Sequence, residues 1–181
     1  MARVLIISGS PTANSRLHGL TQYSEQRLQD FGHEVETLFV ADLPAEDLIK
    51  ANFAGPEIVK AVAAVDRADA VIIASPVYKA SFTGVLKTFL DLLPQKGLQS
   101  KLVLPLFIGG SIAHLLAIDY ALKPVVSALG GTHILQGVYG TDQWVTRLEE
   151  GGYRLDDDLQ LRLSESVSQL HQELQWKTER K

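Results

Sequence analysis

The 181-residue sequence contains no cysteine. This absence excludes disulfides, thiolate metal sites, iron–sulfur clusters and thiol redox chemistry, and it is compatible with a reducing compartment. The sequence also has no apolar run of membrane-spanning length, and the apolar run that precedes Ser8 is too short for the core of a signal peptide. We therefore expect a cytoplasmic protein that does not bind membranes.

An excess of positive charge is also absent. Lys and Arg number 17 against 21 Asp and Glu, which gives a net charge of −4. Because phosphate neutralisation needs clustered basic residues, this balance argues against nucleic acid as the main partner. The 46% of apolar and 21% of charged residues are typical of a globular chain, and the length predicts one domain over residues 1–181.

Strand-like apolar runs alternate with segments of helical periodicity along the whole chain. The predicted strands span residues 3–8, 34–40, 70–75, 102–108 and 132–140. The predicted helices span residues 14–31, 45–51, 57–68, 85–93 and 112–129, and a final helix carries Leu163, Val167, Leu170 and Leu174 on one stripe. Residues 141–157 are predicted to be a loop between the last strand and the final helix.

This alternation predicts an α/β fold with parallel strands joined by right-handed crossovers. We expect a flavodoxin-like three-layer sandwich whose five-stranded parallel sheet has the order 2-1-3-4-5. In such sheets ligands bind beyond the carboxyl ends of the strands. Three unusual loops follow strands here, at residues 8–16, 76–84 and 109–111, and we expect them to converge on one crevice.

The first of these loops, SGSPTANSR, is rich in hydroxyl groups and ends in one arginine. It has neither the Gly-x-Gly-x-x-Gly pattern of a dinucleotide site nor the glycine and lysine pattern of a nucleoside-triphosphate loop. A strand-to-helix loop of hydroxyls suits a terminal monophosphate, as in FMN. The simpler alternative is that Asn14 or Ser15 only caps the following helix.

The other two loops offer groups suited to a polar heteroaromatic ring. Tyr78 supplies a flat side chain. Candidate hydrogen-bond donors to the ring are Ser81, Thr83 and the backbone amides of residues 77–79. The equally ordinary alternatives are that Tyr78 is a surface or oligomer-interface aromatic residue and that Lys79 is a solvated charge. Gly109 and Gly110 allow a ring to approach the backbone closely. The segment GGSIA lacks the Gly-x-Ser-x-Gly pattern of a hydrolase, and His114 has no partners at metal-ligand spacing.

Pro124 lies inside the predicted helix 112–129. Its ring conflicts with the carbonyl of Tyr120, and such conflicts are resolved either as a simple kink or as a π-bulge. The pattern alone favours a harmless kink, with Asp119 and Lys123 paired one turn apart.

Several motifs together resemble the NADPH-dependent FMN reductase family, and in particular the FMN reductases of two-component alkanesulfonate monooxygenase systems. The matching segments are 9-GSPTANSR-16, 76-PVYKAS-81, 84-GVLKTFLDLLP-94 and 109-GGSIAHLLAIDYALKPV-125. The resemblance covers residues 3 to about 138, and the match is poor over residues 141–157.

The resemblance implies that FMN is reduced by NADPH and that the reduced FMN passes to a flavin-dependent monooxygenase. It implies a phosphate site, an isoalloxazine site and a π-bulge at Tyr120 within a homotetramer interface near the flavin. The residues implied for the phosphate are Ser10, Thr12, Ser15 and Arg16, and those for the ring are Pro76, Val77, Tyr78, Lys79, Gly109, Gly110 and Ser111. No catalytic acid or base and no metal ligand is implied.

Two other functions share these features of the sequence. One is a reductase of quinones, azo compounds or metal oxyanions that retains its FMN, and the other is a flavodoxin-type electron carrier without NADPH turnover. The sequence does not separate NADPH from NADH or FMN from FAD.

Overall fold

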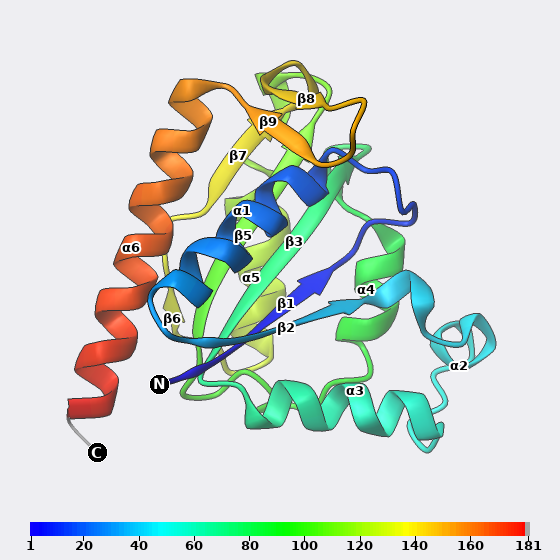
Figure 1. Ribbon diagram of the computed structural model, residues 1–181. Coiled ribbons are helices and arrows are strands. Elements are labelled where there is room, and N and C mark those ends of the chain that lie inside the picture. The colour runs from blue at the N-terminus through cyan, green and yellow to red at the C-terminus, as the bar shows by residue number, and fades with distance from the viewer. Residues whose placement is uncertain (180–181) are drawn as a thin grey trace.

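The computed structural model describes residues 1–179 and is built around one twisted main sheet with helices on both faces (Figure 1). The parallel strands are β1 (Arg3–Ser8), β2 (Glu34–Phe39), β3 (Ala70–Tyr78), β5 (Leu102–Gly109), β6 (His133–Ile134) and β7 (Val138–Thr141). They are arranged in the order β2-β1-β3-β5, and β6 and β7 together form the last position. The predicted flavodoxin-like α/β fold is confirmed, and the order equals 2-1-3-4-5 once the short antiparallel strand β4 (Ser81–Phe82) is left out.

Two apolar cores, one on each face of the sheet, hold the three layers together. Helices α1 (Leu17–Asp30) and α6 (Asp157–Glu179) cover one face, and α6 buries the stripe that was predicted from its periodicity. Helices α3 (Pro56–Arg67), α4 (Gly84–Leu90) and α5 (Lys123–Ala128) cover the other face. The short helix α2 (Ala45–Ile49) lies beyond the end of β2. Because strand residues point alternately to the two faces, Leu5 and Ile7 enter one core while Val4 and Ile6 enter the other.

The predicted strand 132–140 is divided in two, and the reason lies in its neighbour β5. The carbonyl of Val103 accepts a hydrogen bond from the amide of Leu135, so Pro105, two residues further, also faces this edge strand. Proline has no amide hydrogen to donate. A Cβ atom at Gly137 would lie 2.9 Å from the Cβ of Pro105, so the interrupted segment also needs glycine to pass this point.

The prediction of an irregular loop over residues 141–157 was wrong in part. A short 3₁₀ turn, Asp142–Trp144, is followed by β8 (Val145–Arg147) and β9 (Tyr153–Leu155), which pair antiparallel as a separate two-stranded sheet. Gly151 and Gly152, both at positive φ, form the turn between them.

The predicted helix 112–129 is also interrupted. A 3₁₀ turn at Ile112–His114 leads into a π-helix over Ile118–Leu122, and only Lys123–Ala128 is α-helical. Pro124 stands in the first turn of α5, directly after the π-helix, where its missing amide hydrogen is tolerated. The π-bulge implied by the family resemblance is therefore confirmed, and the simple kink favoured by the pattern alone was wrong. The Asp119–Lys123 ion pair is present at 2.5 Å.

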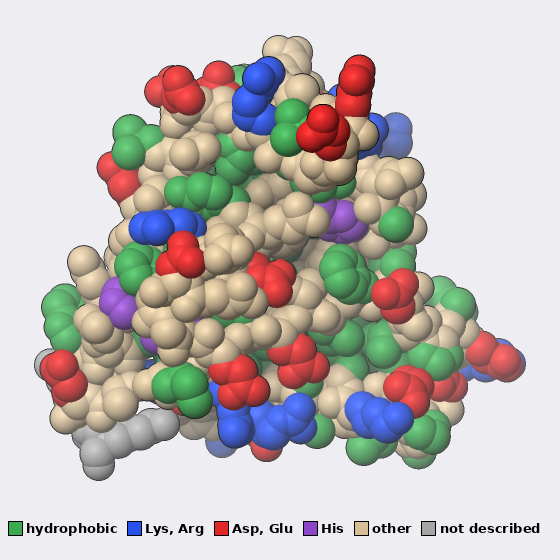
Figure 2. Space-filling model, viewed as in Figure 1, with side chains coloured by type: hydrophobic (Ala, Val, Ile, Leu, Met, Phe, Trp, Pro, Cys, Tyr) green, Lys and Arg blue, Asp and Glu red, His purple; other side chains and the backbone are tan. Residues whose placement is uncertain are grey.

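None of the helices within residues 1–179 has the length and hydropathy needed to cross a membrane. On the face shown in Figure 2, Lys and Arg side chains of the described residues are interspersed with Asp and Glu and form no continuous basic surface. The expectation that nucleic acid is not the main partner remains a prediction.

Two histidines join the turn before β2 to helix α6. The Nε2 atom of His33 lies 2.9 Å from Nδ1 of His171, and Nδ1 of His33 accepts a hydrogen bond from the amide of Ala2 at 3.3 Å. The proton of neutral His33 is therefore on Nε2. A second proton would have to bind Nδ1, where it would point at the N–H group of Ala2 and replace the hydrogen bond that Nδ1 accepts. Burial, and after it the charge of His171, lowers the pKa of His33 below its ordinary value of 6.5.

This lowered pKa predicts a loss of stability in acid. The unfolded chain binds a proton at His33 near pH 6.5 while the folded chain does not, so stability is present above pH 6.5 and declines as the pH falls through the folded pKa. Urea unfolding between pH 8 and pH 5 should show this decline, and His33→Gln should make it smaller. His114→Gln, at an exposed position, is the control and should keep the wild-type pH dependence. An equal decline in wild type and His33→Gln would contradict the prediction.

Candidate functional site

Three strand-end loops meet at the carboxyl edge of the sheet, because β3 is paired in parallel with β1 on one side and β5 on the other. Buried hydroxyls connect the first two loops. The Thr83 hydroxyl donates to the carbonyl of Gly9 at 2.6 Å, and the amide of Thr83 donates to the Ser75 hydroxyl at 3.0 Å. Thr83 was predicted as a donor to a ligand ring. It is instead buried, and it caps α4 by accepting from the amide of Leu86.

The loop after β1 turns through hydrogen bonds within its own residues. The Ser10 hydroxyl is buried, donates to the carbonyl of Thr12 at 3.0 Å and accepts from the amide of Thr12 at 3.3 Å. Gly9 allows the loop to pass close to α4, since a Cβ at this position would lie 2.5 Å from the Cβ of Leu86. The Ser10 hydroxyl thus shapes the loop, while the Thr12 side chain is exposed to solvent.

The last part of this loop presents free amide groups at the start of α1. The Ser15 hydroxyl accepts from the amide of Leu17 at 3.2 Å, so the capping interaction considered from the sequence is present. Within residues 1–179, no acceptor is found for the amides of residues 13–16. Four consecutive amides without an acceptor among the described residues stand next to the positive end of a 14-residue helix, where an anion is favoured.

Arg16 is half-buried and is oriented toward the β8–β9 hairpin. Its Nε atom donates to the carbonyl of Val145 at 3.0 Å. In return, Arg147 donates from Nη2 to the carbonyl of Asn14. Arg147 was not predicted as a site residue, because the poor motif match over residues 141–157 gave no indication that this segment folds back on the loop.

The second loop is a tight hairpin between β3 and β4. Tyr78 pairs with Ser81, and the two residues between them, Lys79 and Ala80, have φ angles of 52° and 65°. This left-handed conformation is unusual for residues other than glycine and fixes the direction of the turn. Pro76 is buried and Val77 half-buried, whereas the Tyr78 ring is 53% exposed at the rim of the site.

The third loop, after β5, is held by a tyrosine that the sequence did not indicate. The Tyr139 hydroxyl donates to the carbonyl of Ser111 at 2.8 Å, and a Cβ at Gly109 would lie only 2.1 Å from this hydroxyl. Gly109 is therefore needed for the packing of Tyr139, in addition to any approach of a ligand. Burial, and after it the charge of Asp142, raises the pKa of Tyr139 above its ordinary value, so the hydroxyl keeps its proton as a donor. Gly110 faces open space.

A hollow of about 340 Å³ lies beside the first loop, on the side of β2. His18 is buried at its wall with the ring edge-on to Phe39 at 5.5 Å, and no partner for its Nε2 atom is found within the described residues. Burial lowers the pKa of His18, and a hydrogen bond to the Ala13 backbone partly offsets this effect. The wall of this hollow thus contains the His18 ring, whose lowered pKa favours its neutral form, together with the carboxylate of Asp42.

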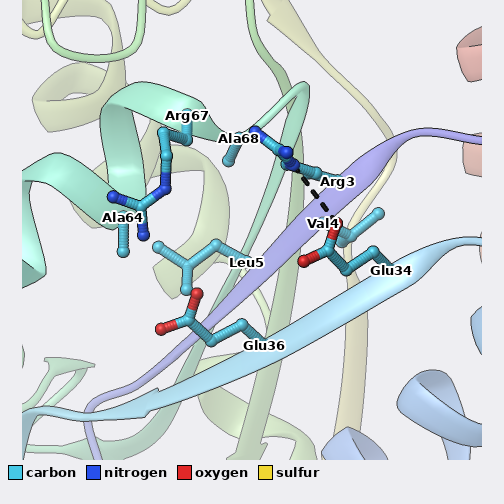
Figure 3. A pocket seen from close by; sticks show the side chains of 8 residues that line it. All are labelled: Arg3, Val4, Leu5, Glu34, Glu36, Ala64, Arg67 and Ala68. Atoms are coloured by element: carbon cyan, nitrogen blue, oxygen red, sulfur yellow. Dashed lines mark hydrogen bonds and ion pairs between the residues drawn. The ribbon is translucent and has the colours of Figure 1, made fainter.

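A second hollow, at the opposite edge of the sheet, contains charges that balance each other. Figure 3 shows two arginines and two glutamates around Leu5, with Arg3 paired to Glu34 at 3.2 Å. This hollow is at the amino ends of the strands, far from the three loops, and none of the predicted site residues lines it.

Apolar side chains lie exposed around the π-helix. Tyr120 is 79% exposed, and Ile112, Leu115 and Leu116 on the preceding turns are each about half exposed. These residues follow directly after the Ser111 turn in the chain, so an apolar surface borders the candidate site. Exposed apolar residues in such numbers mark an interaction surface more often than a solvated one.

The model of the NADPH-dependent FMN reductase family matches residues 2–146. The chain belongs to this family. It is 48% identical over 169 residues to the FMN reductase (NADPH) of Pseudomonas putida, covering 93% of this chain and 86% of that protein. It is 46% identical over 143 residues to the FMN reductase (NADPH) of Escherichia coli, covering 79% of this chain and 75% of that protein.

A solved structure of the same kind is similar over nearly the whole chain. The apo form of an NADH:FMN oxidoreductase, EMOB, superposes with a TM-score of 0.86 at 34% identity, and the match covers 96% of this chain and 90% of that one. The predictions of family and of an oxidoreductase that reduces FMN with NADPH are confirmed by these comparisons. The three loops are therefore the candidate flavin site of an FMN reductase.

The packing of Tyr139 predicts that a substitution by alanine is destabilising at Gly109 and tolerated at the adjacent Gly110. Gly109→Ala should force the Tyr139 ring away from the Ser111 carbonyl and lower the free energy of unfolding by about 1–3 kcal/mol. Gly110→Ala, which meets open space, is the matched control and should change stability by less than about 0.5 kcal/mol. Urea unfolding of the two variants measures the difference. Equal effects would show that the Tyr139 contact does not fix this turn.

Proposed function

We propose that the three loops bind FMN, with its phosphate on residues 10–16 and its ring between the other two loops. In this proposal Ser10, Thr12, Ser15 and Arg16 form the phosphate site. The ring is bordered by Pro76, Val77, Tyr78 and Lys79 on one side and by Gly109, Gly110 and Ser111 on the other. The observation that carries the proposal is the row of free amides at residues 13–16, at the same carboxyl edge of the sheet as the other two loops, in a chain of the FMN reductase family.

The groups present suit a flavin and a nicotinamide better than acid–base chemistry. When bound, FMN accepts a hydride from NADPH, and this transfer needs no acid or base of the protein. The task of the chain is to hold two flat rings at the right distance and to exclude water from between them. The exposed Tyr78 ring and the open space at Gly110 are suited to this task.

The same proposal assigns the reduced FMN to a partner, a flavin-dependent monooxygenase of the alkanesulfonate type. Its support is the extent of the likeness to FMN reductases, which includes the segment around Tyr120. A reductase of quinones, azo compounds or metal oxyanions that retains its FMN has the same fold, and so has a flavodoxin-type electron carrier. The cytoplasmic location stays a prediction from the sequence.

Purified protein separates these functions. We expect a colourless protein that oxidises NADPH only when FMN is added, with one NADPH consumed per FMN reduced under anaerobic conditions. A firmly bound flavin with rapid turnover of a quinone would support the retaining reductase instead. A flavin that stays bound without NADPH oxidation would support an electron carrier.

We further propose that the apolar surface at the π-helix is the interface of a homotetramer. Its support is the exposure of Tyr120 together with that of Ile112, Leu115 and Leu116. Because this surface continues into the Ser111 turn, assembly would enclose the flavin site and limit the access of water. We therefore expect Tyr120 to influence how long the flavin stays bound.

Deletion of Tyr120 should convert the π-helix into an α-helix, since one residue is removed from a turn with i→i+5 hydrogen bonds. The residues before it should then keep their orientation relative to α5, while the apolar surface loses the exposed Tyr120 ring and the wide turn that carries it. We expect altered oligomerisation by light scattering and a protein that is purified yellow. Tyr120→Phe, which keeps the length and the ring, is the control and should assemble as wild type. A colourless deletion variant with wild-type assembly and activity would contradict the proposal.

A further inference from the structure

The β8–β9 hairpin lies against the start of α1 and reaches the loop after β1 (Figure 1). The packing is close at Gly19, where a Cβ would lie 2.8 Å from Cγ1 of Val145 and 3.0 Å from the Cβ of Tyr153. Val145 and Leu155 are buried against the core formed by α1 and α6. The hairpin is therefore fixed to the helix whose amino end forms the proposed phosphate site.

Two arginines connect the hairpin and the loop in opposite directions. Arg16 reaches out from the loop to the Val145 carbonyl, and Arg147 reaches back from the hairpin to the Asn14 carbonyl. Each guanidinium group has five N–H donors, and these bonds use one donor of each. Both side chains therefore hold further donors beside the free amides of residues 13–16.

Neither positive charge is neutralised by a carboxylate. Among residues 1–179, no ion pair is found for Arg16 or Arg147, although Glu149 and Glu150 follow at the hairpin tip. At the opposite edge of the sheet, by contrast, Arg3 is paired with Glu34 (Figure 3). Two cations that share one loop without a counter-charge repel each other, and a dianion between them would relieve the repulsion.

We propose that Arg147 is a phosphate-binding residue of this reductase, and that it makes the chain select flavins with a terminal phosphate over riboflavin. The inference rests on the proposed phosphate site at residues 10–16. Arg147 keeps its bond to Asn14, which positions it, and its remaining donors bind the phosphate opposite the amides. A bidentate, charge-assisted contact of this kind is among the stronger hydrogen bonds in proteins.

The hairpin offers a matched control on its other face. Residues two apart on a strand point to the same face, so Arg147 shares the α1-facing side with Val145, while Thr146 and its partner Arg154 point away. Arg154→Ala removes the same charge from the same small sheet without touching the loop. Arg147→Lys keeps the charge but loses the planar fork of donors.

The test is the affinity of the apo protein for FMN and for riboflavin, measured by quenching of flavin fluorescence. Arg147→Ala should raise the Kd for FMN by about 10- to 100-fold and that for riboflavin by less than about twofold. Arg147→Lys should give an intermediate Kd for FMN, and Arg154→Ala should match wild type. Added salt should weaken FMN binding less in Arg147→Ala than in wild type.

Two outcomes would overturn the inference. Unchanged FMN affinity in Arg147→Ala would exclude a phosphate contact. An equal loss of affinity for both flavins, with a lower melting temperature, would show that Arg147 only holds the hairpin in place.

The double variant Ser15→Ala/Arg16→Ala tests the phosphate site itself. If it weakens FMN binding while Arg147→Ala does not, only the role of Arg147 is wrong. If it leaves FMN binding unchanged, the proposed phosphate site is wrong, whatever Arg147→Ala does.

Discussion

The site depends first on the parallel pairing of β3 with β1 and with β5. Parallel strands end at the same edge of a sheet, so this pairing alone brings together three loops that begin at residues 8, 76 and 109 of the chain. The buried Thr83 hydroxyl then joins the second loop to the first through the Gly9 carbonyl, and the buried Ser75 hydroxyl holds the second loop against its own strand. Each satisfies backbone groups that the close packing has removed from water. Loss of either would leave an unpaired polar group in the interior.

Charge is distributed unevenly between the two edges of the sheet. At the amino edge, arginine and glutamate side chains share one hollow and compensate each other. At the carboxyl edge, free amides, a helix amino end and two arginines that have no ion pair within residues 1–179 gather around one loop, and the nearby His18 has a lowered pKa that favours its neutral form. An edge built in this way attracts an anion, and the family of the chain supplies the anion in the form of a flavin phosphate.

The elements of the sheet were predictable because buried parallel strands leave continuous apolar runs, as in Val4 to Ile7 and Val71 to Ala74. The errors arose where one segment depends on another. Pro105 lies within a strand that tolerates it, and its effect is the interruption of the neighbouring strand at Leu135 to Gly137. No pattern within residues 132–140 reveals this, since the missing donor is about thirty residues away.

The sequence by itself determined the class of fold, the three loops and the absence of a dinucleotide or triphosphate fingerprint, because periodicity and short motifs are local properties. The Tyr120 π-helix became predictable only through likeness to a family. Tertiary structure alone decided that Tyr139 holds the Ser111 turn and that Arg147 returns to the loop of Asn14. The two contacts join residues that are 28 and 133 positions apart in the sequence. Such contacts follow from the packing of distant segments and not from neighbouring residues.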